Sequence, residues 1–430
     1  MTDYFSIIIT LVLFVAVMII FSQDKMDYVA YSMGAALIAS VITALRFDTS
    51  LEDFVSTIEV TPLIFILSMQ IMVMIAEQYK IFQWVAVKTL HITKGNHRAF
   101  FYLICIIGTI TAAIIADVTV AIIFVPLVIR ACRILNIRPA PYLFGITITI
   151  NIGSIITPFS SSENILISSA FSLGADWFMG NMIIFVVIAL AATLILLDLL
   201  MLKKQAPPEE ARKKILLEIM DPGLVIINKK QFILNSIYFT LVILGFIFVS
   251  DYSYLIALLG AIVMSLLNKK SITDSMAKID WKVIFFFISL FLLIGNMDIN
   301  GTFDIIGNLL SKVPTDNEIL MALGVLIITS LMSGFLANSP TAIVGITLLS
   351  DLYSGTPPNI VLIAFLLGIN LGGNILPQGA ACDIMTLNIA TEQKVEGFTY
   401  KTLLKKGGTF ALIHIGMCII YLVAYGLIVS

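Results

Sequence analysis

Long apolar runs separated by short polar breaks extend along the whole chain. A helix needs about 20 predominantly apolar residues to cross the hydrocarbon core of a bilayer. Runs that approach or exceed this length predict embedded segments near 5–21, 27–45, 60–76, 99–116, 118–135, 141–171, 177–201, 231–250, 253–268, 281–297, 318–337, 340–352, 358–390 and 409–429. The pattern therefore predicts an all-α polytopic membrane protein.

Two pairs of these runs are separated by breaks that are too short for a loop outside the bilayer. Asp117 alone divides the first pair, and Asn338 and Ser339 divide the second. Each pair predicts a re-entrant hairpin, at 99–135 and at 318–352, whose tip stops partway through the membrane. The remaining runs predict about ten full transmembrane helices.

The distribution of charge predicts which loops lie inside the cell, because lysine and arginine mark the cytoplasmic side. Basic residues flank both ends of the first hairpin, whereas acidic Glu318 and Asp351 flank the second. The polar segment 203–230 is rich in lysine and arginine and is predicted to be a cytoplasmic linker. This topology places both termini on the extracytoplasmic side of a cell membrane, which we predict to be the plasma membrane.

The linker divides two copies of one plan, residues 1–202 and residues 231–430. IIADVTVAIIFVPL, from Ile114, aligns with FLANSPTAIVGITL, from Phe335, and INIGSIITP, from Ile150, aligns with INLGGNILP, from Ile369. An odd number of crossings between equivalent elements would invert the second copy relative to the first. Inverted repeats with interrupted helices are typical of secondary transporters, whose site lies near the midplane where the repeats meet.

Polar residues interrupt the two helices predicted at 141–171 and 358–390. Gly153 and Pro158 break the first helix, and the segment 372–379 breaks the second. Irregular backbone at membrane depth is tolerated only against protein or a water-filled cavity. The half-helix that follows each break would point free N–H groups at an oxygen-rich solute. The predicted substrate-binding residues are Asn151, Gly153, Thr157, Ser160, Ser161, Ser162, Asn164, Asn338, Asn370, Gly373, Asn374 and Gln378.

Acidic residues at membrane depth are functional candidates by default. The predicted ion-coupling residues are Asp117, Glu163 and Asp383. We expect Asp117 to be the main protonatable group, because it lies at a hairpin tip and its repeat mate, Asn338, is neutral. A purely structural alternative stays open, in which Asp117 and Ser339 are the N-caps of the second hairpin arms and Pro340 follows at the first helical position.

Composition and motifs narrow the class of protein. The chain is 59% apolar and 12% charged, with a net charge of −2, which argues for lipid as its main solvent and against a nucleic-acid partner. The cysteines and histidines keep no ligand spacing, so we expect no metal site and no cofactor. No HExxH or GxxxxGK[ST] motif occurs, so we expect neither an enzyme nor ATP hydrolysis by this chain. A homodimer and a separate ATPase subunit remain open.

The two breaks resemble those of the ion transporter superfamily, in particular its arsenite permease (ArsB) and NhaD sodium/proton antiporter branches. Asn151, Gly153, Thr157 and Asn164 match the family's first break at the same spacing. The interior differs, because Ser-Ser-Ser-Glu at 160–163 replaces the family's Gly-Asp-Pro-Pro. NLGGNILPQG, from Asn370, is similar to the second break, although Ala380 replaces a serine of the family. The resemblance implies scaffold and transport domains and an elevator-like motion.

These observations predict a secondary active transporter driven by an ion gradient. A pocket of hydroxyls, amides and half-helix starts without arginine or lysine favours a small inorganic substrate, such as arsenite or antimonite, extruded in exchange for protons. Sodium/proton antiport is the alternative, in which the three acids alternate between protonated and sodium-bound states. Sodium-coupled transport of a small anion is a third hypothesis.

Overall fold

Helices account for all regular secondary structure in the part of the chain that the structure, a computed structural model, describes: residues 3–21, 26–249, 252–268, 276–305, 317–353 and 355–429. Nine helices within these ranges are long and apolar enough to cross a membrane. The prediction of an all-α polytopic membrane protein is confirmed.

The first half contains α1 (Tyr4–Phe21), α2 (Tyr28–Phe47), α3 (Leu51–Ser56), α4 (Val60–Gln78), α5 (Ile81–Ile92), α6 (His97–Ala112), α7 (Asp117–Leu135), α8 (Ala140–Gly153), α9 (Ser162–Phe171) and α10 (Ala175–Leu200).

The second half contains fewer described helices, joined to the first by a linker with two short ones. The linker holds α11 (Glu210–Ile219) and α12 (Pro222–Val225). The helices that follow are α13 (Lys229–Phe248), α14 (Ser253–Leu267), α16 (Trp281–Ile299), α18 (Glu318–Leu336), α19 (Asn338–Tyr353), α20 (Asn359–Gly372), α21 (Ala381–Glu392) and α22 (Tyr400–Val429).

Packing sorts the membrane helices into two groups, each drawn from both halves of the chain. In one group, α2 packs against α1 and α16, and α4 packs against α13 and α14. In the other, α8 packs against α6, α7 and α10, α20 packs against α18 and α22, and α7 packs against α21. Contacts of α4 with α9 and of α16 with α19 join the two groups. We call them the outer group (α1, α2, α4, α13, α14 and α16) and the core group (α6–α10 and α18–α22).

Both interrupted helices are broken where the sequence places glycine and proline. The α8 helix ends at Gly153 and α9 begins at Ser162, while α20 ends at Gly372 and α21 begins at Ala381. In each break a single 3-10 turn, 154–156 or 373–375, precedes a residue with extended backbone. The first predicted hairpin contains α6 and α7, and the second contains α18 and α19.

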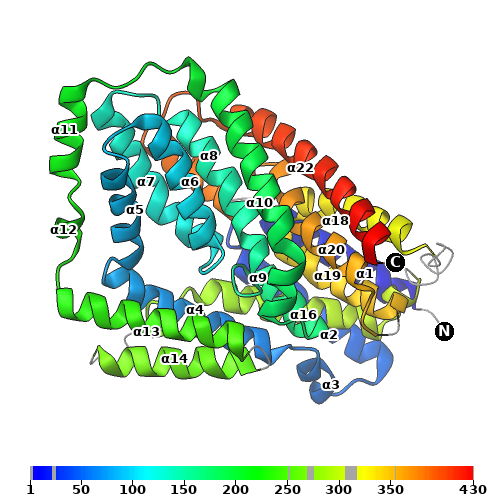
Figure 1. Ribbon diagram of the computed structural model, residues 1–430. Coiled ribbons are helices and arrows are strands. Elements are labelled where there is room, and N and C mark those ends of the chain that lie inside the picture. The colour runs from blue at the N-terminus through cyan, green and yellow to red at the C-terminus, as the bar shows by residue number, and fades with distance from the viewer. Residues whose placement is uncertain are drawn as a thin grey trace.

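The linker lies at the opposite end of the molecule from both termini (Figure 1). Its α11 packs against α7, and its α12 packs against α5. Arg212 donates a hydrogen bond to the Ile134 carbonyl at 3.4 Å, and His91 Nε2 donates one to the Leu217 carbonyl at 3.0 Å. The predicted polar linker therefore contains two helices that pack against α7 and α5.

Candidate functional site

The two breaks come close to the hairpins because glycine ends the helix before each one. A Cβ atom at Gly153 would lie 2.3 Å from the Thr109 carbonyl oxygen on α6, and a Cβ atom at Gly372 would lie 2.4 Å from the Ser330 carbonyl oxygen on α18. No side chain larger than hydrogen fits between these backbones. Each broken helix therefore lies directly against the first arm of the hairpin in its own half.

Further hydrogen bonds tie each break to its hairpin. Thr157 Oγ1 donates to the Ala113 carbonyl at 2.5 Å, at the end of α6. Ser333 Oγ, on α18, donates to the Ile369 carbonyl at 2.7 Å. Break and hairpin thus form one unit in each half.

A buried polar cluster joins the first broken helix to the second. Asn151, on α8, donates from Nδ2 to Asp383 Oδ1 at 3.2 Å and also to the side-chain oxygen of Asn374. Thr147, one helical turn before Asn151, donates to the same Asp383 oxygen at 2.8 Å. The Cys382 thiol donates to Asn151 Oδ1 at 2.8 Å. Asp383 is 2% exposed, and two uncharged donors, Thr147 and Asn151, hold its carboxylate away from bulk water.

The reciprocal contacts lie on the other side of the same crossing. Asn370, on α20, donates from Nδ2 to Asn164 Oδ1 at 3.0 Å, and Ser154 Oγ donates to Asn370 Oδ1 at 3.3 Å. The Asn164 amide in turn donates to the carbonyls of Ser154 at 2.6 Å and Thr157 at 3.2 Å. Asn164 therefore satisfies backbone groups that the break leaves without helical partners.

Glu163 binds the tip of the second hairpin. Asn338 Nδ2 donates to Glu163 Oε1 at 3.0 Å, and the Ser339 hydroxyl donates to Oε2 at 3.4 Å. Ser333 donates to Asn338 Oδ1 at 2.6 Å, so the amide is oriented from both sides. The same amide oxygen closes over Gly373, where a Cβ atom would lie 2.6 Å from it. A carboxylate of the first half thus holds the hairpin tip of the second.

Asp117 is the first residue of α7, and its carboxylate is the least constrained of the three acids. Its Oδ1 accepts a hydrogen bond from the Val118 backbone N–H at 2.8 Å, and the residue is 9% exposed. It interacts electrostatically with Glu163 and Asp383. The three carboxylates are therefore near enough to one another to interact electrostatically.

Neither residue named in the capping alternative occupies an N-cap position. Ala116, not Asp117, occupies the N-cap position of α7, and it makes no side-chain cap. Ser339 is the second residue of α19, Pro340 is the third, and the Ser339 hydroxyl bonds to Ser162 and Glu163. Ser339 therefore has contacts inside the site, whereas the Asp117 carboxylate accepts the free Val118 N–H of the first turn of α7.

The serines of the first break have mainly structural contacts. Ser161 is the N-cap of α9 and accepts a hydrogen bond from the Asn164 N–H at 3.4 Å. Ser160 donates to the Thr157 carbonyl at 2.7 Å, so its hydrogen-bonding capacity is used within the break. Ser162 turns toward the second hairpin and lies 3.0 Å from the Ser339 hydroxyl.

Gln378 does not join the cluster. Its side-chain oxygen accepts a hydrogen bond from the Tyr400 hydroxyl at 2.8 Å, at an exposed position. Sequence reasoning also omitted Thr147, Ser154 and Ser333 from the site. Thr147 and Asn151 are four residues apart, so both lie on one face of α8. This helical spacing is the signal that could have identified Thr147.

The cluster contains no basic side chain. Every lysine and arginine in the described ranges is at least partly exposed, whereas Asp117, Glu163 and Asp383 are all buried. Within the same ranges, no group of three or more histidine, cysteine, aspartate or glutamate residues is arranged to hold a metal ion. Neutral hydroxyls and amides surround three acids.

Comparison with known proteins identifies the family. The sequence profile described as "Citrate transporter" (CitMHS) matches residues 13–368 and also residues 253–429. The chain belongs to the citrate transporter (CitMHS) family. This family member is similar over 422 residues, at 22% identity, to a 46 kDa membrane protein of Mycobacterium leprae, covering 96% of this chain and 98% of the relative.

Two solved transporter structures share the fold of this citrate transporter family member. The first is MtrF of Neisseria gonorrhoeae, with a TM-score of 0.59 at 15% identity, covering 89% of this chain and 83% of MtrF. The second is the YdaH transporter of Alcanivorax borkumensis, with a TM-score of 0.57 at 12% identity, covering 91% of this chain and 89% of YdaH. The family match and the membrane-length helices identify the chain as a multi-pass membrane transporter.

Proposed function

We propose that this protein is a secondary active transporter in which Asp117, Glu163 and Asp383 bind the coupling cation. The observation that carries the proposal is the burial of three carboxylates without a basic partner at the crossing of two broken helices. An uncompensated buried charge is expensive, so the carboxylates need protons or metal cations for neutralisation. A gradient of such a cation can then supply the energy for transport.

The first substrate candidate is a metalloid hydroxide such as arsenite or antimonite, extruded in exchange for protons. Uncharged hydroxy species suit a site that offers hydroxyls and amides but no lysine or arginine. The resemblance of both breaks to those of arsenite permeases supports the same choice. Protons on the carboxylates and substrate on the neighbouring amides would then bind alternately, as exchange of substrate for protons requires.

A carboxylate such as citrate is the second candidate, and the family match favours it. A polyanion beside three buried carboxylates requires cations, because the site has no positive side chain to offset its charge. This reading therefore predicts coupling to sodium or protons that bind together with the anion. Sodium/proton antiport uses the same acids and needs no further substrate.

The packing suggests how the site changes sides. We propose that the core group moves as an elevator against the outer group, and that residues 1–202 and 231–430 are inverted repeats. The reciprocal bonds of Asn151 with Asp383 and of Asn370 with Asn164 support the repeat, because the alignment pairs these residues. Both breaks and both hairpins lie in the core group, so they would move together.

Counterflow in proteoliposomes tests the proposed function. Vesicles preloaded with arsenite, citrate or sodium would be diluted into the labelled form of the same solute, with proton or sodium gradients imposed separately. We expect arsenite exchange that responds to the proton gradient. Citrate exchange that requires sodium would favour the second candidate, and sodium flux driven by protons alone would favour antiport. Absence of any gradient-dependent flux of these solutes would contradict the assignment of the three acids as a coupling site.

A further inference from the structure

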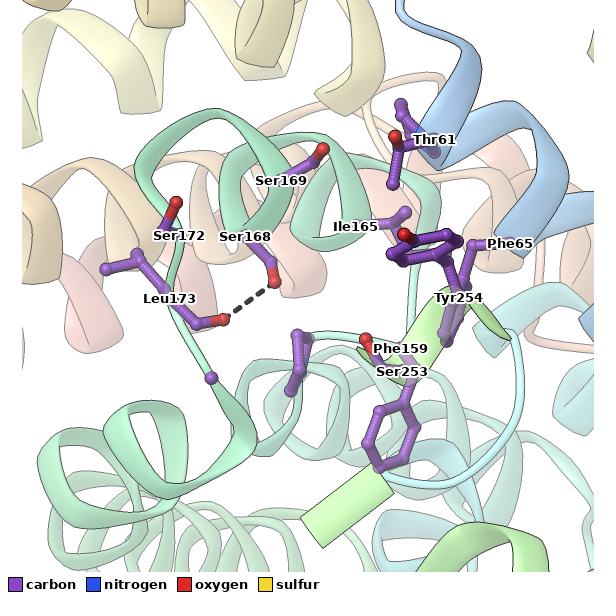
Figure 2. Close-up of a pocket in the computed structure, with 13 residues that line it drawn as sticks. Thr61, Phe65, Phe159, Ile165, Ser168, Ser169, Ser172, Leu173, Ser253 and Tyr254 are labelled. Carbon is purple, nitrogen blue, oxygen red and sulfur yellow. Dashed lines mark hydrogen bonds between the residues drawn. The ribbon is translucent and has the colours of Figure 1, made fainter. Parts of the chain in front are cut away.

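A separate cavity of about 340 Å³ lies between the core group and the outer group, beside the first break. Figure 2 shows side chains entering it from the first turns of α4, from α9 and the turn after it, and from the start of α14. Small-molecule sites typically have volumes of about 300–1,000 Å³. The cavity is large enough to enclose a small organic solute.

The cavity uses a different face of α9 from the carboxylate cluster. Ile165, Ser168 and Ser169 of α9 line it at helical spacing, whereas Glu163 and Asn164 bond within the cluster. Pro158 and Phe159 of the break form part of its wall. A ligand here would therefore contact the break without occupying the cation site.

Hydroxyl groups with no protein partner surround the space. In the described part of the chain, the hydroxyls of Thr61, Ser172, Ser253 and Tyr254 make no hydrogen bond to another protein group, unlike Ser168, which donates to the Leu173 carbonyl at 2.7 Å. Figure 2 shows these residues on the first turn of α4, in the turn after α9 and at the start of α14. Each can both donate and accept a hydrogen bond.

The remaining lining is apolar and uncharged. Phe65, Phe159 and the ring of Tyr254 offer aromatic surface, and no lysine, arginine, aspartate or glutamate lines the cavity. The adjacent cavity of about 390 Å³ differs, because Glu59 and Asp298 line it. Charge therefore distinguishes two neighbouring spaces that share Pro62 and Ser169.

We propose that the uncharged cavity is a second binding site, for a neutral small molecule that carries several hydroxyl groups and one aromatic or aliphatic face. Hydroxyls on α4, on α14 and in the turn after α9 would bond to the polar part, and the aromatic side chains would cover the apolar part. Because its walls come from both groups of helices, a bound molecule holds the groups in their present relation. A bound molecule would slow transport only if the two groups move relative to each other, so this effect on transport rests on the proposed function.

Site-directed labelling tests binding without requiring transport. The four native cysteines are buried, so an impermeant maleimide should report only on an introduced thiol. Ser253→Cys places a thiol on the α14 wall, and Ser172→Cys places one on the α9 side. Phenyl β-glucoside is the probe, because it is neutral, rich in hydroxyls and aromatic at one end. Phenyl β-glucuronide has the same rings with one carboxylate and is the charged comparison.

We expect the glucoside to slow labelling of both cysteines by about tenfold at ten times its dissociation constant, because only unoccupied sites react. The glucuronide should protect much less. Ser56→Cys in the acidic cavity and the exposed Thr356→Cys are matched controls that should label at unchanged rates. Equal protection by both probes, protection of the controls, or no protection at either wall would overturn the proposal. In the counterflow assay, the glucoside should also lower the parent's rate without changing which gradient drives it.

Discussion

The Asn370 amide donates a hydrogen bond to Asn164 at 3.0 Å, and its counterpart in the aligned halves is the bond from Asn151 to Asp383 at 3.2 Å. The donors are the same residue type, but one acceptor is a neutral amide and the other is a carboxylic acid. Asn164 also donates to two backbone carbonyls, whereas the Asp383 carboxylate accepts from its neighbours, including Thr147. The same position has thus become structural in one half and ionisable in the other.

Exchanging the two acceptors should separate these roles. Asp383→Asn keeps an oxygen that can accept from Thr147 and Asn151, so we expect near-parental folding with altered ion dependence of transport. Asn164→Asp places a carboxylate against the carbonyls of Ser154 and Thr157 and removes two donors. The Ser160 hydroxyl can satisfy only one of these two carbonyls. Leaving a buried polar group unsatisfied costs about 1–3 kcal/mol, so this variant should lose thermal stability.

Thermal unfolding of both variants in detergent, alongside counterflow, provides the measurement. An Asp383→Asn protein that unfolds much earlier than the parent would assign Asp383 a structural role. An Asn164→Asp protein as stable as the parent would show that the break does not need the Asn164 amide.

Gly153 and Gly372 should be equally intolerant of a methyl group. An added Cβ atom would meet a backbone oxygen of α6 or α18 at 2.3 or 2.4 Å, and neither backbone can move without shifting its hairpin. Overpacking of this kind costs about 1–3 kcal/mol, so Gly153→Ala and Gly372→Ala should each unfold at a lower temperature than the parent.

Gly180→Ala in α10 is the matched control, because nothing lies within 4 Å of its added Cβ atom. It should be neutral or slightly stabilising, since alanine is the better helix former. Equal melting temperatures for all three alanine variants would mean that the breaks do not approach the hairpins this closely.

The positions of the breaks could be predicted from sequence because they depend on local backbone chemistry. A glycine followed a few residues later by a proline marks each break, Gly153 with Pro158 and Gly372 with Pro377, because both residue types disfavour a continued helix. The partners of each polar side chain could not be predicted in the same way. Gln378 bonds to Tyr400, and Ser161 caps α9, because packing between distant segments decides which way each side chain points. Cys382 belongs to the cluster for the same reason, because its thiol contacts Asn151 of the other half.

The linker should be accessible only from the cytoplasm. Figure 1 places it at the opposite end from both termini, and its lysines and arginines predict the cytoplasmic side. Lys214 is exposed on α11, so Lys214→Cys should react with a permeant maleimide in whole cells but not with an impermeant one. Cysteine at the exposed Thr356, predicted to be external, should react with both. Rapid reaction of Lys214→Cys with the impermeant reagent would reverse the predicted orientation.

Asp117→Asn should abolish coupling to the proton gradient while preserving the fold. The side-chain amide oxygen of this variant can still accept the Val118 N–H, which is the one hydrogen bond that the native carboxylate makes in the described chain. The change removes a buried ionisable group and its electrostatic interaction with Glu163 and Asp383. If losing the titrating group costs at least about 1.4 kcal/mol of coupling, proton-driven flux should fall by at least about tenfold, and the remaining flux should depend less on pH.

Asp176→Asn, at an exposed position near the start of α10, is the control and should keep the parent's rate and pH profile. Both proteins should melt at the parental temperature in detergent, which separates a coupling defect from misfolding. An Asp117→Asn protein with the parent's flux and pH dependence would transfer the coupling role to Glu163 or Asp383, whose carboxylates lie in the same cluster.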